Sequence, residues 1–130
     1  GHPVACAAGL VTLDIMEREN VVENSRIMGE YLFESLQSLR SHRIVGEIRG
    51  GLGLDSQVEF VKDREAKEPF SPEENKRFAP MLKGKLREAG LWGSFGNPLQ
   101  LKPPLTITQD EINEIVTALD RVTGEIEKEF

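Results

Sequence analysis

The side chains most often used for metal binding and nucleophilic catalysis are scarce in this sequence, which holds two histidines and one cysteine. His2, Cys6 and His42 are not joined by further ligands at metal-site spacing, and no serine stands in an elbow motif. Cys6 lies among alanines, where a lone cysteine is usually a small buried hydrophobic residue. We therefore predict no metal site and no catalytic residue within this chain.

A glycine-rich stretch, Gly50 to Gly53, is the second feature that could do chemistry, because glycine loops cradle phosphates. It lacks the Gly-Lys-Ser/Thr ending of a phosphate-binding loop and does not complete the dinucleotide fingerprint. A strand connection that needs positive φ or close backbone approach explains it better. The acidic pair Glu73 and Glu74 is likewise explained by helix capping rather than by carboxylate catalysis.

Four segments have apolar residues at helical spacing. The first, from Pro3 to about Glu19, is apolar around much of its girth, so we expect it to lie wedged between layers. The second runs from Val21 to about Leu39 and is amphipathic. The third begins with a capping box at Ser71 and ends at Ala89, with a kink or a break at Pro80, and the last follows a second capping box at Thr108.

Short segments rich in β-branched residues predict strands at 44–49 and 56–61, followed by a surface loop at 64–70. A less regular hairpin is expected from strands at 91–95 and 99–101. The resulting order, α-α-β-β-α-β-β-α, favours an α+β fold: a small, mostly antiparallel sheet with helices packed mainly on one face.

Size and charge narrow the class of protein. The 130 residues fit a single domain, 1–130, and no apolar run reaches the length of a membrane span. A net charge of −6 without a basic cluster argues against nucleic acid as a partner. The single cysteine cannot form an internal disulfide, which fits a reducing compartment, and we expect a cytoplasmic protein with no membrane partner.

Four stretches of the sequence form one ordered pattern. They are Gly1–Ala8, Val45–Gly50 followed by Leu52-Gly53-Leu54, the helix exit Leu86–Leu91, and Pro103–Thr108 before the last helix. In this order they resemble the small C-terminal domain of class III (omega-type) pyridoxal-phosphate aminotransferases, which are fold-type I enzymes. The resemblance runs from Gly1 to about Leu119.

This resemblance implies transfer of an amino group between an amine or amino acid and a 2-oxo acid, usually by a homodimer. In that family a large cofactor domain precedes this segment and holds the catalytic lysine, so the chain is expected to be a fragment. Alone it should be inactive and bind no pyridoxal phosphate. Gly1 and His2 are expected near the dimer interface, and no cofactor-binding residue is assigned to this chain.

Two departures from the family pattern fall in the expected substrate pocket. Many relatives carry an arginine three residues before the Pro-Pro pair, where it can hold a substrate carboxylate, and here that position is Gln100. Omega-amino-acid relatives place a mobile arginine where this chain has Gly93. Outside these two positions, this chain has Asp55, Ser56 and Gln57 where relatives generally carry small, apolar residues. The usual carboxylate specificity therefore cannot be transferred to this chain.

Two alternatives remain open at this stage. The chain could be a freestanding ligand-binding or interaction module with the same α+β layout, or a relative with amino-lyase chemistry, because fold and cofactor do not fix the reaction. If a large domain is missing, the helix beginning at Pro3 should expose an apolar patch.

Overall fold

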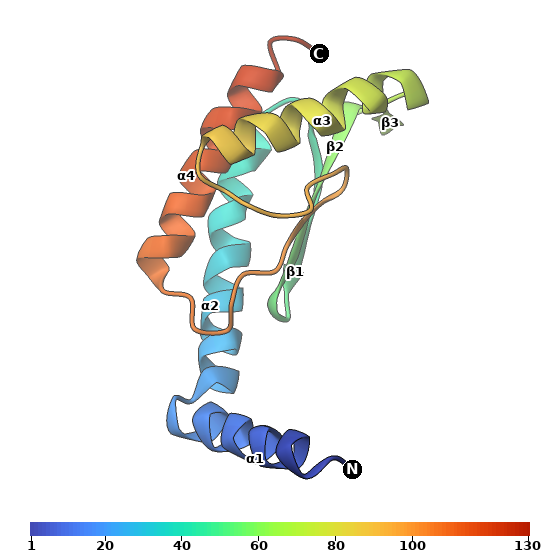
Figure 1. Cartoon of the computed structure of the whole chain (residues 1–130). Helices are drawn as coiled ribbons and strands as arrows, with labels where there is room; N and C mark the ends of the chain where they lie inside the picture. Colours follow the sequence, from blue (N-terminus) through green and yellow to red (C-terminus); the bar gives the residue numbers. More distant parts are fainter.

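The computed structural model describes residues 1–130 and shows an α+β fold, as predicted (Figure 1). None of its helices combines the length and apolar character that crossing a membrane requires. The elements are the helices α1 (Pro3–Arg18), α2 (Val21–Leu36), α3 (Pro72–Glu88) and α4 (Gln109–Ile126), the 3-10 helix η1 (Gln37–Ser41), and the strands β1 (Val45–Gly51), β2 (Gly53–Asp63), β3 (Glu68–Pro69) and β4 (Leu99–Leu101).

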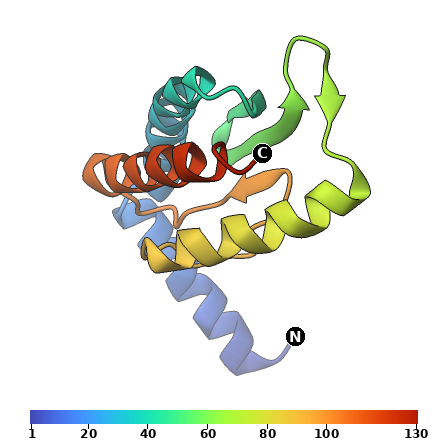
Figure 2. The same cartoon turned by 90° about the horizontal axis from the view of Figure 1, so that it is seen from above.

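Strand β2 is the centre of the sheet. It pairs antiparallel with β1, and also antiparallel with β4 and with the short β3. Helix α2 packs against β1 and β2, and α4 lies against both α2 and α3 (Figure 2). The predicted small antiparallel sheet with its covering helices is therefore confirmed.

The core lies between the sheet and these three helices. Leu32 of α2, Phe78 of α3 and Leu119 of α4 are fully buried, and they meet Val58 and Phe60 of β2 in one apolar cluster. The Phe60 and Phe78 ring centroids are 4.9 Å apart, a tilted arrangement that adds to the burial of both rings. This cluster fixes α3 over the end of the sheet.

The glycine-rich connection between β1 and β2 behaves as predicted. Gly51 and Gly53 have φ values of 88° and 66°, which glycine adopts without the steric cost of a side chain. A Cβ atom on Gly29 of α2 would lie 2.1 Å from the Gly53 carbonyl oxygen. The glycines therefore serve a tight turn and a close approach between helix and turn.

Both predicted capping boxes are present. The Glu74 amide donates to Ser71 Oγ at 3.2 Å, and Glu111 donates in the same way to Thr108 Oγ1 at 3.4 Å. The glutamate carboxylates accept the Ser71 and Thr108 amides, each at 2.8 Å. These backbone hydrogen bonds lower the pKa values of Glu74 and Glu111.

The sequence predicted a kink or a break of α3 at Pro80, and the break is wrong, because the helix runs without interruption from Pro72 to Glu88. Proline removes one backbone hydrogen bond, but it does not by itself remove the packing on either side. Phe78, Leu82 and Leu86, on either side of Pro80, are fully buried, so core packing supports the helix through the proline.

Several boundaries differ from the sequence-based expectations. Helix α2 ends at Leu36 and continues as η1 to Ser41, which tightens the last turn before β1. The expected loop at 64–70 contains β3, whose residues pair with the end of β2. The expected strand at 91–95 is irregular, and β4 pairs with β2 instead of forming a hairpin with that segment.

Helix α1 is not wedged between layers within this chain, which corrects the prediction. None of its sixteen residues is buried, and it contacts only α2 (Figure 1). The side chains of Val4 and Leu10 are 70% and 65% exposed. The apolar patch expected around this helix is therefore present.

The side chain of His42 contacts two acidic side chains near the carboxyl end of α4. Its Nε2 atom lies 2.9 Å from Asp120 Oδ1, and its Nδ1 atom lies 3.3 Å from Glu127 Oε2. Burial would raise the pKa of Glu127, but hydrogen bonds from His42 and from the Arg43 and Ile44 amides together lower it. These contacts connect the end of α4 to the segment before β1.

Candidate functional site

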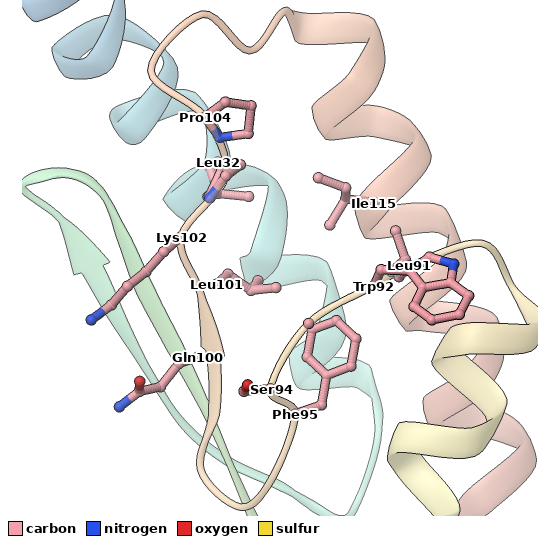
Figure 3. A pocket seen from close by; sticks show the side chains of 12 residues that line it. Leu32, Leu91, Trp92, Ser94, Phe95, Gln100, Leu101, Lys102, Pro104 and Ile115 are labelled. Carbon is pink, nitrogen blue, oxygen red and sulfur yellow. The ribbon is translucent and has the colours of Figure 1, made fainter.

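A hollow of about 390 Å³ opens between the segment that follows α3 and the segment that contains β4 (Figure 3). Leu32 of α2 and Ile115 of α4 complete its wall. Its lining is Leu32, Leu91, Trp92, Gly93, Ser94, Phe95, Gln100, Leu101, Lys102, Pro103, Pro104 and Ile115. Gly93 and Gln100, the two predicted substrate-pocket residues, therefore line the same hollow.

The end of α3 directs the chain into this hollow. Gly90 has a φ of 89°, its amide donates to the Arg87 carbonyl at 3.0 Å, and the Leu91 amide donates to the Leu86 carbonyl at 2.8 Å. These two hydrogen bonds form a Schellman motif, which satisfies carbonyl groups at the helix end and turns the chain sharply. Leu91 consequently packs against the core, and Trp92 follows at the surface.

Asn97 holds the other end of the segment against the sheet. Its Oδ1 atom accepts the Phe60 amide at 2.9 Å, and its Nδ2 atom donates to the Phe60 carbonyl at 2.8 Å. The side chain thus occupies the backbone groups of β2 that a neighbouring strand would use. The sequence analysis placed Asn97 only between two expected strands, at 91–95 and 99–101, so this anchoring role was missed.

The apolar wall of the hollow is made by side chains that sequence analysis did not assign to a site. Phe95 and Leu91 pack against the core cluster, while Trp92 remains 78% exposed. The Arg87 guanidinium carbon lies 5.2 Å from the Trp92 ring centroid, within cation–π distance. The apolar spacing of this segment was interpreted as a strand, although an irregular segment can carry the same residues.

Gly93 and Gln100 contribute differently to the hollow. A Cβ atom on Gly93 would lie 2.8 Å from a ring carbon of Phe95, so a larger residue there requires the ring to move. Gln100 is exposed on β4 between the buried Leu99 and Leu101. Figure 3 shows the Gln100 side chain on the opposite side of the β4 ribbon from Phe95.

The hollow has little that could hold a strongly charged group. Lys102 is the one charged residue in its lining, and its Nζ atom pairs with Asp55 Oδ2 at 3.4 Å. No group of histidine, cysteine and carboxylate side chains is arranged to hold a metal ion. The geometry therefore fits an apolar wall beside a polar sheet face rather than a site for a phosphate or a metal.

Gly1 and His2 lie away from this hollow. His2 precedes α1 and makes no side-chain capping hydrogen bond, and both residues are exposed. In Figure 1 the amino terminus lies beyond the helices and sheet that form the core. The structure brings Gly93 and Gln100 together but does not bring Gly1 or His2 to them.

Comparison with known proteins gives a consistent match along nearly the whole chain. Residues 1–123 match the family model described as Aminotransferase class-III. The chain is 37% identical over 133 aligned residues to taurine–pyruvate aminotransferase of Bilophila wadsworthia, with 95% of this chain and 28% of that relative covered. It is 38% identical to ethanolamine-phosphate phospho-lyase homolog 1 of Caenorhabditis elegans, covering 94% of this chain and 26% of that relative.

Solved structures agree with the sequence match. The structure of an (S)-enantioselective omega-transaminase from Thermomicrobium roseum superimposes with a TM-score of 0.88 at 35% identity, covering 97% of this chain and 28% of that one. A transaminase from an ancestral-reconstruction study gives a TM-score of 0.90 at 36% identity, covering 99% and 28%. The chain spans about a quarter of the length of these relatives. It belongs to the class III aminotransferase family.

Proposed function

We propose that this chain is the C-terminal small domain of an aminotransferase that transfers an amino group between an amine or amino acid and a 2-oxo acid. The family match over residues 1–123, combined with coverage of only 28% of the relatives' length, carries the proposal. In this role, the hollow beside Gly93 and Gln100 is a wall of the substrate pocket. The single cysteine of this chain, Cys6, fits a cytoplasmic enzyme.

Class III aminotransferases depend on pyridoxal phosphate, whose ring serves as an electron sink in amino-group chemistry. The residues of this chain do not fit that cofactor by themselves, since a phosphate needs cationic or amide donors that converge on it. The only cation in the hollow, Lys102, is paired with Asp55. The cofactor therefore belongs, in this proposal, to a larger domain of the same enzyme.

The exposed surface of α1 supports the same arrangement. Val4, Leu10, Val11 and Leu13 are each more than half exposed, which is an unfavourable amount of apolar surface to leave in water on one helix. We propose that the large cofactor domain covers this surface, and that the enzyme acts as a homodimer with Gly1 and His2 near the subunit interface. This covering would stabilise α1, which has no buried residue here.

The proposal is tested by adding pyridoxal phosphate to the 130-residue chain, recording its visible absorbance and assaying amino transfer to pyruvate. We expect neither a protein-bound cofactor spectrum nor transfer. The Bilophila wadsworthia relative, whose name states its reaction with taurine and pyruvate, is the positive control. A bound spectrum with amino transfer by the chain alone would contradict the proposal.

A lyase is the second candidate function, favoured by the 38% identity to the phospho-lyase homolog. In a lyase, the same enzyme would release phosphate from a phosphorylated amino alcohol instead of transferring the amino group. Measuring phosphate release from ethanolamine phosphate, next to alanine formation from pyruvate, distinguishes the two reactions in the full-length protein.

A further inference from the structure

We propose that Asn24 of α2 is a positioning residue for the substrate pocket, because its side chain fixes one wall of the hollow. This inference rests on the proposed function and adds to it a residue that controls which substituents the pocket accepts. Asn24 does not line the hollow itself. It acts through the segment 102–108, which connects β4 to α4 and supplies Lys102, Pro103 and Pro104 to the lining.

The segment 102–108 has few backbone hydrogen bonds of its own. Proline has no backbone N–H group, so Pro103 and Pro104 cannot donate a hydrogen bond. Within the segment, the Ile107 amide donates to the Pro104 carbonyl at 3.0 Å and closes a single turn. The part of the segment that faces the hollow therefore depends on an anchor from another element.

Asn24 supplies this anchor from the beginning of α2. Its Nδ2 atom donates to the Leu105 carbonyl at 2.7 Å and to the Ile107 carbonyl at 3.1 Å, which are 81 and 83 positions away in the sequence. The two hydrogens of the amide group are thereby both used, and only the NH2 end of the side chain can face two carbonyl oxygens. No other side chain hydrogen-bonds to the backbone of 102–107.

Helix α2 therefore positions the lining of the hollow at two points. Leu32 lines the hollow directly and lies eight residues beyond Asn24, about 12 Å along the helix. On the other side of the hollow, Asn97 anchors the segment that follows α3 through the Phe60 backbone groups. Each of the two irregular segments that line the hollow is thus held by one asparagine side chain.

Loss of the Asn24 donor should displace this wall and leave other parts of the pocket in place. Ile107 is 4% exposed, and its carbonyl would lose the asparagine partner. A buried carbonyl without a partner is unfavourable, so the segment should shift until water or another donor reaches it. A substituent packed against Pro104 would then lose contacts, whereas a substrate too small to reach the hollow would not.

The test uses the full-length protein and compares Asn24→Asp with Asn113→Asp. Aspartate keeps the size of the side chain and is favourable near the amino end of a helix, but it cannot donate to the two carbonyls. Asn113 accepts the Tyr31 hydroxyl at 2.8 Å, so aspartate keeps that hydrogen bond in the control. The amine donors are 1-phenylethylamine and isopropylamine, which differ only in a phenyl ring that replaces one methyl group, and pyruvate is the acceptor.

We expect Asn24→Asp to lower kcat/KM for 1-phenylethylamine about tenfold, because one to two net hydrogen bonds are lost. The value for isopropylamine should stay within about twofold of the wild type, and Asn113→Asp should resemble the wild type for both amines. A role in folding alone would lower both values equally, so equal losses, or no loss, would overturn the positioning role. If Asn24→Asp does not fold, Asn24→Ser replaces it with the same expected result, since serine is too short to reach both carbonyls.

A second measurement separates this inference from failure of the proposed function. Hydrogen–deuterium exchange of the amides at 105–107 should be about tenfold faster in Asn24→Asp and unchanged in Asn113→Asp. If the wild type transfers no amino group from any amine, the proposed function fails, while faster exchange still supports Asn24 as the residue that positions this wall. Unchanged exchange in Asn24→Asp would overturn the inference whether or not the enzyme is active.

Discussion

Helices α1 and α4 lie near the two ends of the chain, and both have apolar residues at helical spacing, yet they have opposite surroundings. Helix α4 buries Ile112, Leu119, Val122, Thr123 and Ile126, whereas α1 buries nothing. Helix α4 also begins with a capping box, while His2 makes no capping contact at α1. The comparison shows that apolar residues at helical spacing indicate a helix surface that packs against something, but they do not indicate which part of a protein packs there.

The largest difference between the two helices, in the free energy of unfolding, should come from matched leucine truncations. Leu119→Ala removes a fully buried side chain from α4 and should destabilise the chain by about 2–5 kcal/mol. Leu10→Ala removes a 65% exposed side chain from α1 and should change the free energy of unfolding by less than about 0.5 kcal/mol. Urea unfolding followed by circular dichroism measures both, and equal effects would remove the distinction between the helices.

Substitutions at the starts of the two helices should also affect the free energy of unfolding more at α4 than at α1, by a smaller amount than the leucine truncations. Thr108→Ala removes the hydroxyl that accepts the Glu111 amide and should cost about 1 kcal/mol. His2→Ala should leave the free energy of unfolding unchanged, because His2 caps nothing. A loss of stability in the His2 variant as large as that in the Thr108 variant would show that α1 has a capping contact in solution.

A pair of threonines, one in α4 and one in α1, extends the comparison of these helices to a substitution that should stabilise the protein. Thr123 of α4 is buried and its hydroxyl has no hydrogen-bond partner, so Thr123→Val should stabilise the chain by about 1 kcal/mol. Thr12 of α1 donates to the Ala8 carbonyl at 2.9 Å on an exposed surface, and Thr12→Val should be neutral. Thermal unfolding of the two variants measures the difference, and a lower Tm for Thr123→Val would show that its hydroxyl is satisfied in solution.

The pH dependence of stability should be the smallest of these effects. The Thr108 amide and hydroxyl lower the pKa of Glu111 below its ordinary value of 4.5. A carboxyl group with a lowered pKa in the folded state stabilises the fold above that value, and this contribution is lost as the pH falls through the folded pKa. Glu111→Gln should therefore weaken the loss of stability between pH 5 and pH 3, measured by urea unfolding at each pH; an unchanged slope would contradict the assignment.

Much of the fold could be predicted because local signals and tertiary packing agree. The capping boxes at Ser71 and Thr108 fixed where two helices begin, and the glycines between β1 and β2 indicated a tight connection. The strand expected at 91–95 was wrong for a physical reason. The Schellman motif at Gly90 turns the chain, and the Asn97 side chain occupies the Phe60 backbone groups, so the sheet has no place for that strand.

The site was predictable only in part. The family resemblance directed attention to Gly93 and Gln100, and both line one hollow. The aromatic residues around them, Trp92 and Phe95, carried no signal beyond being apolar. The pairing of Gln100 with Gln57 depends on strand register between residues far apart in the sequence, which a single sequence does not determine.

We propose that the uncovered surface of α1 packs against a larger domain of the enzyme. Hydrogen–deuterium exchange of the Pro3–Arg18 amides, measured in the 130-residue chain and in the full-length protein, tests it most directly. We predict rapid exchange in the isolated chain, strong protection in the full-length protein, and equal protection of Gln109–Ile126 in both. Equally rapid exchange of Pro3–Arg18 in both proteins would contradict the account.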